Sequence, residues 1–324
     1  MTFLCRGHND SRFIVECDHV HTYVVTGGAG FIGSHIVKSL LSGGNAVLVI
    51  DDLSTGLSSN LPRDTPLFTF DVSNGHDLQN LTKQLPAIDA VFHCAAQASV
   101  SVSTEDPERD YAVNATGTAH LLEMCEALSC PLVFTSTAGV YGDDAPRPTP
   151  ENSTIAPLSP YAFSKATAES LIHNHSTRTG LPHAICRLAN VYGPRQRGDG
   201  EAGVVAVIAN KLSSGQPITL YGRGAPTRDF VHVQDVASAL LTALGTRGVF
   251  NVATGTETSV RDVFDLACDA LGVNVSPVLA ELRAGEILHS SLSTTHTGDI
   301  LGWFSRISVA DGIPSTIRAL AGET

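Results

Sequence analysis

The chain has little of what marks several classes of protein. Among its 324 residues one is Trp and two are Met, and 20 Lys and Arg stand against 32 Asp and Glu, which gives a formal net charge of −12. Such an acidic chain argues against nucleic acid as a partner, because nucleic acids are bound by basic patches. The sequence also lacks an apolar run of about 18 residues, so we expect no segment that spans a membrane.

Cysteine is present, but not in a pattern that indicates pairing. The seven cysteines are an odd number, and no C-x-x-C motif occurs. Several stand in apolar runs, so we expect buried thiols in a reducing compartment, the cytoplasm, rather than a disulfide framework. Neither His173 with His175 nor Cys125 with Cys130 has a convincing zinc-ligand spacing, so we predict no metal site.

The remaining composition is that of a globular protein. Hydrophobic residues make up 43% of the chain and charged residues 16%, and the length exceeds that of one average domain. Residues 1–22 are polar and lack the apolar core of about 7–15 residues that a signal peptide needs. We expect them to be either a disordered extension or the product of an upstream start codon.

A glycine-rich turn follows the first predicted strand. Residues 23–26 are apolar and β-branched, as in a buried parallel strand, and they lead into Gly27, Gly30 and Gly33. Glycine permits a tight turn and lets the backbone approach a pyrophosphate closely. The helix expected at 34–41 would direct its first N–H groups at the phosphates. This strand–turn–helix context predicts a dinucleotide-binding site.

A second predicted strand, at 46–50, ends at Asp51 and Asp52. Asp51 follows Gly33 by 18 residues, close to the distance expected for an acid that binds the adenosine ribose. A carboxylate there would repel a 2′-phosphate, so NAD is favoured over NADP; the alternative is a solvated turn. Three further strands are expected at 68–70, 91–94 and 132–134.

Tyr161 and Lys165 stand four residues apart in a stretch that we expect to be helical, so both side chains lie on one face. An ammonium beside a phenol lowers the phenol's pKa from its usual value of about 10. The phenolate could then take a proton from a substrate alcohol near neutral pH. A lone Tyr-x-x-x-Lys pair is weak evidence, but downstream of a nucleotide-binding signature it indicates a dehydrogenase-type site.

Ordered matches over most of the chain, from about 23 to 303, identify a family. The matching stretches are residues 26–33, 51–56, 93–97, 136–142, 159–161 with Lys165, 190–196, 227–233 and 301–303. In these stretches the chain resembles the extended short-chain dehydrogenase/reductase family. Within that family it is most similar to the NAD-dependent nucleotide-sugar epimerases, with the UDP-glucose 4-epimerases as the nearest group.

The resemblance implies an α/β fold, which the alternation of short strands and helices also predicts. We expect a Rossmann-type doubly wound parallel sheet with a smaller C-terminal α/β substrate domain. The NAD-binding domain should span 23–188 with contributions from about 229–255, and 189–324 should bind mainly the sugar nucleotide. The strands near 227–232 and 250–253 are expected to join the first domain.

The reaction that the resemblance implies is 4-epimerisation of a nucleotide sugar of the UDP-glucose/UDP-galactose type. Tyr161 would take the proton of the 4-OH group, directly or through Thr137. Tightly bound NAD would accept a hydride from C4 of the sugar, which becomes a 4-keto sugar. The hydride would then return to the opposite face of C4. Lys165 would lower the pKa of Tyr161 and bind the nicotinamide ribose.

Ala138 and Gly139 distinguish this chain from other members of the family. Related dehydratases usually carry Asp-Glu at these positions, and related decarboxylases carry Ser-Glu. Neither Ala nor Gly can act as an acid or a base, and both leave room for a sugar to turn. The pair therefore favours epimerisation.

The resemblance also assigns binding residues. The residues expected to bind NAD are Gly27, Gly30, Phe31, Ile32, Gly33, Asp51, Asp52, Ser54, Thr55, Gly56, Asp71, Val72, Ala95, Ala96, Gln97, Asn114, Thr135, Tyr161 and Lys165. The residues expected to bind the UDP-linked substrate are Ser99, Thr137, Ala138, Tyr161, Asn190, Arg197, Val204, Arg228 and Arg283. The helices expected around 108–128 and 161–178 would pair across a two-fold axis, which implies a homodimer.

Several alternatives remain open. Arg197 stands where many of these epimerases have an acid, so it either meets the carboxylate of UDP-glucuronate or another modified sugar, or is a solvated arginine. A 4-keto-sugar reductase or dehydratase is a second kind of enzyme. A non-catalytic NAD-binding regulator is a third possibility, which the intact Thr137, Tyr161 and Lys165 argue against.

Overall fold

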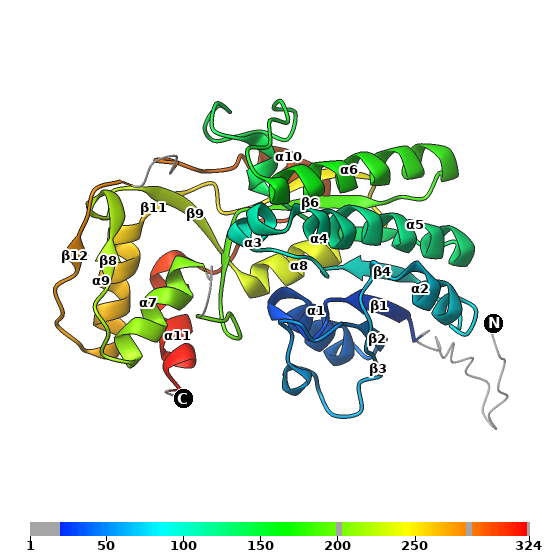
Figure 1. The fold of residues 1–324 in the computed structure, drawn as a ribbon, viewed down its shortest axis with the longest axis horizontal. Helices are drawn as coiled ribbons and strands as arrows, with labels where there is room; N and C mark the ends of the chain where they lie inside the picture. The colour runs from blue at the N-terminus through cyan, green and yellow to red at the C-terminus, as the bar shows by residue number, and fades with distance from the viewer. Residues whose placement is uncertain (1–19, 199–202, 283–286, 323–324) are drawn as a thin grey trace, which may run out of the picture.

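A computed structural model describes residues 20–198, 203–282 and 287–322. Its central element is a seven-stranded sheet in the order β10-β6-β5-β4-β1-β2-β3, with every pair of neighbours parallel (Figure 1). The strands are β1 (Thr22–Thr26), β2 (Ala46–Ile50), β3 (Leu67–Phe68), β4 (Ala90–His93), β5 (Leu132–Thr137), β6 (Ala184–Leu188) and β10 (Gly248–Val252). The order reverses between β1 and β4, where doubly wound sheets bind ligands.

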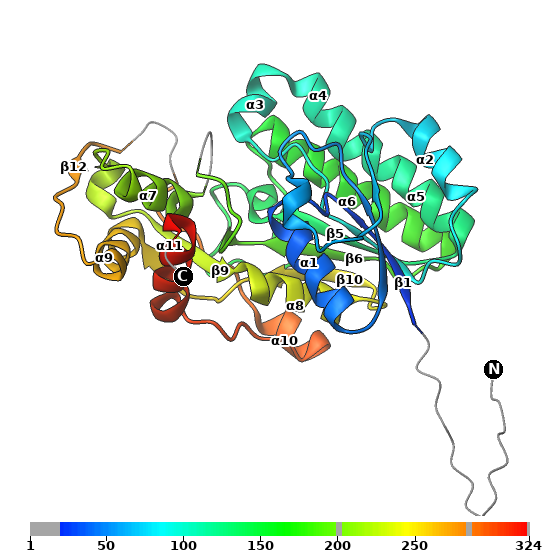
Figure 2. The ribbon, with the colours of Figure 1, turned by 90° about the horizontal axis from the view of Figure 1, so that it is seen from below.

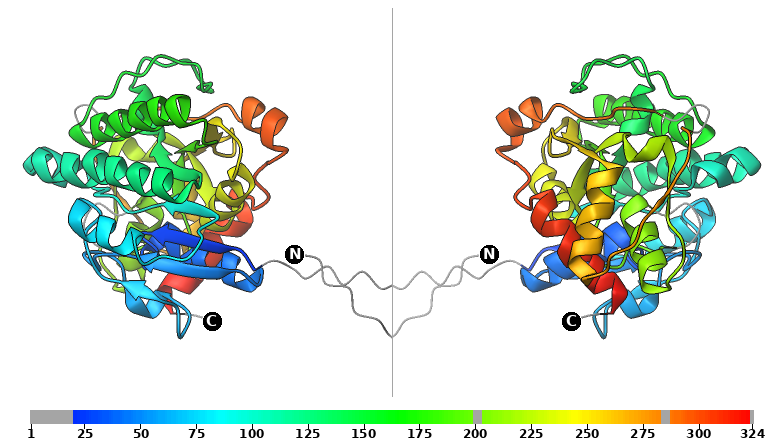
Figure 3. Two further views of the ribbon diagram at one scale, coloured as in Figure 1. Left: turned by 90° about the vertical axis from the view of Figure 1, so that its right-hand side faces the viewer. Right: turned by 90° about the vertical axis from the view of Figure 1, so that its left-hand side faces the viewer.

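Helices cover both faces of this sheet, because its strands are apolar on both sides. Val25 and the next-but-one residue Tyr23 pack against one helical layer, and Val24 packs against the other. The first layer holds α1 (Phe31–Ser42) and α8 (Val233–Ala243), with α10 (Thr295–Leu301) beside β10. The second layer holds α2 (Gly75–Thr82), α5 (Gly117–Leu128) and α6 (Pro160–Thr179), and Figure 3 shows α5 and α6 side by side.

Helix α6 has clear local start and stop signals. Ser159 caps it by accepting the Ala162 N–H at 3.2 Å, and Pro160 occupies the first turn, where its missing N–H costs nothing. Gly180 ends it at φ 77°, in the left-handed region that favours glycine. These signals place Tyr161 in the first turn of the helix. Shorter helical segments surround the site: α3 (Val100–Glu105), α4 (Pro107–Tyr111), a π-helical turn (Ala112–Thr116) and 3₁₀ turns at Ser58–Asn60, Ala138–Tyr141 and Tyr221–Gly224.

Figure 2 shows a second, smaller set of elements beside the large sheet. This set has its own hydrophobic core. Its sheets contain β7 (Asn190–Tyr192), β9 (Thr227–His232) and β11 (Glu257–Ser259), and separately β8 (Thr219–Leu220) and β12 (Val278–Leu279). Its helices are α7 (Val204–Ser213), α9 (Val260–Leu271) and α11 (Val309–Ala321). Ser259 and Asp262 form a capping box that starts α9.

The two strands that we expect to join the first domain pair in different sheets. The strand near 250–253 does join the large sheet as β10, but β9 pairs with β7 in parallel and with β11 antiparallel. The chain leaves the large sheet at Leu188 and starts β7 at Asn190, so β9 finds its partner there. Strand β9 forms the seam between the two parts, because Phe230 packs into the smaller core and Val231 into the larger one.

Two expectations concern residues that the structure does not describe. One is the N-terminal extension, of which residues 1–19 are not described, and the other is the role of Arg283 in substrate binding. Within the described ranges, no helix is both long and apolar enough to cross a bilayer.

Candidate active site

A cavity of about 690 Å³ lies at the carboxyl ends of β1, β2 and β4. Its floor is the turn that Gly27 begins at φ 64°. A Cβ at Gly33 would stand 2.1 Å from the Gly27 carbonyl oxygen, and a Cβ at Gly27 would stand 2.6 Å from the Ala95 nitrogen. Only glycine fits at both positions, so the first turn of α1 comes close to the cavity and can present its N–H groups to a phosphate.

An acidic pair forms the wall of this larger cavity beyond β2. The Asp51 carboxylate accepts the Ala29 and Leu53 N–H groups, each at 2.9 Å, and the side chain is 5% exposed. Burial raises the pKa of Asp51, and these backbone bonds lower it. Asp52 is exposed and accepts from the backbone and hydroxyl of Ser54. Carboxylates held in this way suit hydrogen bonding to ribose hydroxyls.

Most of the residues predicted to bind the cofactor come together here. The larger cavity is lined by the predicted Gly27, Gly30, Phe31, Ile32, Gly33, Asp51, Asp52, Ser54, Thr55, Asp71, Val72, Ala95, Ala96 and Gln97. Ser99, predicted for the substrate, lines it too. Sequence reasoning missed Phe70, Cys94, Ala98, Val102, Asp106, Arg109 and Val113. The first three flank residues that were predicted, and could have been found as parts of the same strand ends; α3 and α4 carry no such signal.

Five predicted cofactor residues lie outside this lining: Gly56, Asn114, Thr135, Tyr161 and Lys165, of which Tyr161 lines the smaller cavity described below. Asn114 is 1% exposed. Its side-chain amide accepts the Gln97 N–H and donates to the Gln97 carbonyl and to the Ser164 hydroxyl. Thr135 donates to the His93 carbonyl at 3.0 Å. These side chains hold the cavity's segments together from behind.

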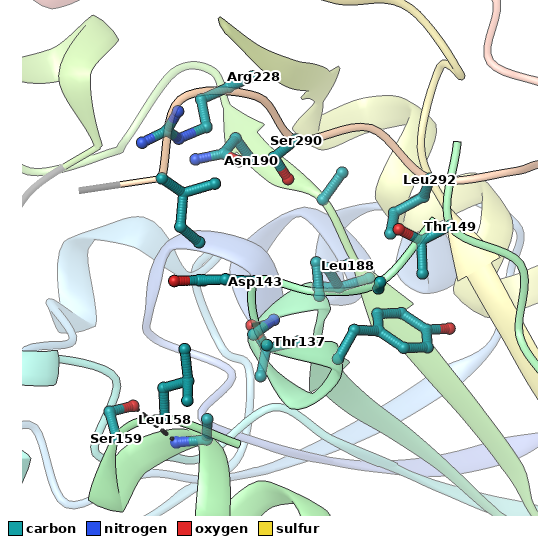
Figure 4. Close-up of a pocket in the computed structure, with 18 of the residues that line it drawn as sticks. Thr137, Asp143, Thr149, Leu158, Ser159, Leu188, Asn190, Arg228, Ser290 and Leu292 are labelled. Atoms are coloured by element: carbon teal, nitrogen blue, oxygen red, sulfur yellow. Dashed lines mark hydrogen bonds between the residues drawn. The ribbon is translucent and has the colours of Figure 1, made fainter. Parts of the chain in front are cut away.

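A second cavity, of about 330 Å³, adjoins the ends of β5 and β7 (Figure 4). It brings together the predicted Thr137, Ala138, Tyr161, Asn190 and Arg228. Figure 4 shows Asn190, Arg228 and Ser290 grouped on one side and Ser159 on the other, with Thr137 between them. Sequence reasoning missed Asp143, Arg147, Thr149, Leu158, Ser159, His289, Ser290 and Leu292. Ser159 belongs to the matching stretch at 159–161 and could have been found there. Most of the others belong to the loop at 143–158 and to the segment at 289–292, which carry no motif.

Tyr161 and Thr137 are neighbours in this smaller cavity. Burial raises the pKa of Tyr161 to about 12, a hydrogen bond from Thr137 lowers it, and the charge of Asp110 raises it. Thr137 Oγ1 accepts the Gly139 N–H at 3.1 Å, so its own proton can be donated elsewhere. The two hydroxyls therefore form a short path along which a proton can move.

Lys165 lies one turn after Tyr161 on α6, in a buried position. Its side chain is 2% exposed, and Nζ lies 4.1 Å from the centre of the Phe134 ring. Burial lowers the pKa of Lys165 to about 8, and Cys94, Glu169 and Asp110 raise it. Burial opposes the phenolate and the ammonium alike. The lowering of the Tyr161 pKa by Lys165 stays a prediction.

Besides Ser99, two described residues that were predicted to bind substrate do not line the smaller cavity. Arg197 is exposed and donates from Nη1 to the Thr55 carbonyl at 3.3 Å, so it reaches the loop that lines the larger cavity. Val204 opens α7 and packs against the smaller core. Arg228, in contrast, lines the smaller cavity and donates to the Thr227 carbonyl at 2.8 Å. Among the described residues, no group of three or more His, Cys, Asp or Glu could hold a metal ion.

Comparisons with known proteins agree with this geometry. The model of the NAD dependent epimerase/dehydratase family matches residues 23–253. A UDP-glucose 4-epimerase of Mycolicibacterium smegmatis is 38% identical over 305 residues, which cover 91% of this chain and 97% of the relative.

Solved structures show the same fold. The UDP-glucose 4-epimerase of Thermotoga maritima, determined with UDP-glucose, superposes with a TM-score of 0.89 at 36% identity and covers 93% of this chain and 99% of its own. The UDP-glucose 4-epimerase of Thermus thermophilus, in complex with NAD, gives a TM-score of 0.85 at 39% identity, covering 94% and 100%.

Proposed function

Because this chain belongs to the NAD dependent epimerase/dehydratase family, we propose that it is an NAD-dependent UDP-sugar 4-epimerase of the UDP-glucose/UDP-galactose type. One observation carries the proposal: Thr137 and Tyr161 line the same cavity as Ala138 and Gly139. That cavity holds a proton-transferring pair but lacks, at those two positions, the acid–base pair of the dehydratases and decarboxylases. The cavity therefore suits a reaction that needs only reversible oxidation at C4.

The larger cavity fits NAD. Its glycine floor, where a Cβ at Gly33 would collide with the backbone, admits a pyrophosphate, and Asp51 stands at the ribose position. When bound, NAD supplies the hydride acceptor and donor for sugar C4. Lys165 would hold the nicotinamide ribose, and the carboxylate of Asp51 would bind the adenosine ribose and disfavour a 2′-phosphate.

In the smaller cavity the chain's own groups move the proton and hold the nucleotide. Thr137 donates to Tyr161, so the 4-OH proton passes to the phenol directly or through the threonine hydroxyl. Asn190 and Arg228 lie together on the other side of Thr137, where Arg228 can bind the diphosphate with charge-assisted bonds (Figure 4). The small side chains at 138 and 139 leave the sugar room to turn.

The two sets of elements would bind different ligands. Residues 23–188 with β10 would form the NAD-binding domain, and most of 189–324 the domain that binds the sugar nucleotide. In the assembly, α5 and α6 would pair with their copies in a homodimer, and the compartment would be the cytoplasm. Arg197 contacts Thr55 rather than lining the smaller cavity, which leaves the uronate alternative without support from its position.

The test is incubation of the purified protein with UDP-glucose, UDP-N-acetylglucosamine or UDP-glucuronate, with no NAD added, followed by separation of the C4 epimers. We expect conversion of UDP-glucose to UDP-galactose by retained NAD. Activity that appears only with added NAD(P)H and a 4-keto sugar would replace the proposal by a reductase. Failure with all three substrates, when NAD is demonstrably bound, would reject it.

A further inference from the structure

A buried ion pair stands behind the helix that carries Tyr161 and Lys165. Glu169 and Arg187 are 7% and 5% exposed, and Arg187 donates from Nε and Nη2 to both carboxylate oxygens at 2.6 to 3.2 Å. The attraction within a buried ion pair at best offsets the cost of removing the two charges from water. A gain in folding stability is therefore a weak explanation for its presence. The reason for its presence lies in what the two side chains contact.

The Glu169 carboxylate joins two catalytic segments. On α6, Glu169 follows Lys165 by one turn and Tyr161 by two, so all three lie along one side of the helix. Its Oε1 also accepts the Ser136 hydroxyl at 2.5 Å. Ser136 directly precedes Thr137 at the end of β5. One carboxylate therefore links the strand end that holds Thr137 to the helix that holds Tyr161 and Lys165.

Arg187 extends this link to the wall of the smaller cavity. Its Nη1 donates to Tyr141 Oη at 2.9 Å and to the Glu151 carbonyl at 3.0 Å, and the guanidinium lies 4.7 Å from the Tyr141 ring centre. Tyr141 lines the smaller cavity and donates in turn to Asn251 Oδ1 at 2.7 Å. Strands β5, β6 and β10 and helix α6 thus share one hydrogen-bonded network behind the site.

We propose that Glu169 is a positioning residue: with Ser136 and Arg187 it fixes the Thr137 hydroxyl relative to Tyr161, and it places a buried carboxylate one turn from Lys165 on the same side of α6. The catalytic part rests on the proposed function, because it concerns the proton path of that reaction. A catalytic group displaced by about 1 Å can lose a large part of its effect, so a link that fixes two such groups bears directly on turnover.

The charge of Glu169 acts on Lys165 as well. The groups that face Lys165 are His93 and Cys94 at the end of β4, Phe134 on β5, Asp110 on α4 and Glu169 on its own helix. Burial opposes the ammonium, and the carboxylates of Glu169 and Asp110 favour it. Cys94 is a neutral thiol near the Lys165 midpoint, because burial raises its pKa to about 12. Removal of the Glu169 charge should therefore lower the pKa of Lys165 further.

The positional part is tested with Ser136→Ala, which removes one hydrogen bond and leaves the ion pair in place. We expect kcat to fall about tenfold with KM nearly unchanged, because the substrate still binds but the proton path is loosened. Ser176→Ala is the matched control. Ser176 is on α6, is 3% exposed, and also donates one short bond, to the Leu181 carbonyl at 2.6 Å. A loss of kcat no greater than the control's would overturn the positional part.

The charge part is tested with Glu169→Gln by titration of lysines labelled with ¹³C at Cε. The chain has four lysines, so the Lys165 signal can be assigned by its loss in Lys165→Met. We expect the Lys165 midpoint, near 8, to move to lower pH in Glu169→Gln, and the alkaline limb of kcat/KM to move with it. Glu126→Gln is the control, since Glu126 is bonded by Arg178 in an exposed pair near the far end of α6.

The two proposals fail in different ways. A wild-type protein that epimerises no UDP-sugar contradicts the proposed function, whereas the lysine titration needs no substrate. An unchanged Lys165 midpoint in folded Glu169→Gln overturns the inference whatever the activity. If Glu169→Gln does not fold, Ser136→Ala decides, since its ion pair is intact.

Discussion

At the scale of single residues, the site depends on groups whose protonation is set by burial. The pKa of Tyr161 is raised to about 12 and that of Lys165 is lowered to about 8, and burial is the first cause of both shifts. The phenol thus keeps its proton at neutral pH, since the hydrogen bond from Thr137 opposes the effect of burial on its pKa without cancelling it. The sequence shows the spacing of the Tyr–Lys pair, but not the enclosure that decides which charge each group carries.

Substitution of Tyr161 by Phe should abolish most of the turnover. The change removes only the hydroxyl that receives the substrate proton in the proposed reaction, so we expect kcat to fall by about 10²–10⁴-fold, the usual contribution of a general acid–base group. The measurement is epimer formation under saturating substrate. Tyr111→Phe, in which an exposed phenol on α4 is altered, is the control and should be unaffected. Wild-type turnover in Tyr161→Phe would remove this residue from the mechanism.

At the scale of helices and strands, local sequence patterns predict the bounds of several elements but do not show which strands pair. The expected strand at 46–50 has the bounds of β2, and the helix expected at 34–41 lies within α1. Apolar runs and glycines fix such elements locally. No local signal shows the sheet to which β9 belongs, because that depends on β7, which lies more than thirty residues earlier in the chain. The contact between Arg197 and Thr55 joins residues 142 apart, and no local signal reports it.

Two buried histidines connect α6 to the starts of β5 and β6. His183 Nδ1 accepts the Leu132 N–H at 2.9 Å, so its proton is on Nε2, which bonds His175 Nδ1 at 2.8 Å. Both rings are therefore neutral, and each acceptor nitrogen faces a donor. Burial is the first cause that lowers both pKa values, that of His183 to about 4. A proton added to either acceptor nitrogen would face another N–H group and break the hydrogen bond.

This pair predicts a loss of stability in acid. Because the folded pKa values lie below 6.5, the unfolded chain binds protons first, so the contribution is complete above about pH 6.5 and is lost as the pH falls towards 4. For His183 alone this is of order 3 kcal/mol. Urea unfolding from pH 7.5 to 4.5 should show a shallower pH dependence in His183→Gln than in wild type. His173→Gln, an exposed site on the same helix, should leave it unchanged; equal slopes in all three would contradict the assignment.

At the scale of the whole molecule, the flank formed by α4 and α6 has an unusual surface. Tyr111 and Phe163 expose 44% and 57% of their area, and Leu158, just before α6, exposes 70%. Large apolar side chains gathered on one flank are typical of an interface between proteins. The four-helix pairing implied by the family resemblance would cover α5 and α6 on this flank (Figure 3).

A single charge should test that assembly. Phe163→Glu places a carboxylate where a second copy of α6 would pack, so we expect the molar mass from light scattering to fall from that of a dimer to that of a monomer, with NAD still bound. Phe304→Glu is the matched control, because Phe304 is 61% exposed but follows α10, near the other helical layer. If both variants keep the wild-type mass, the α6 flank is not the interface. If the wild type is itself a monomer, the exposed aromatic side chains need another partner, and the cleft between the two parts of one chain must hold the whole site.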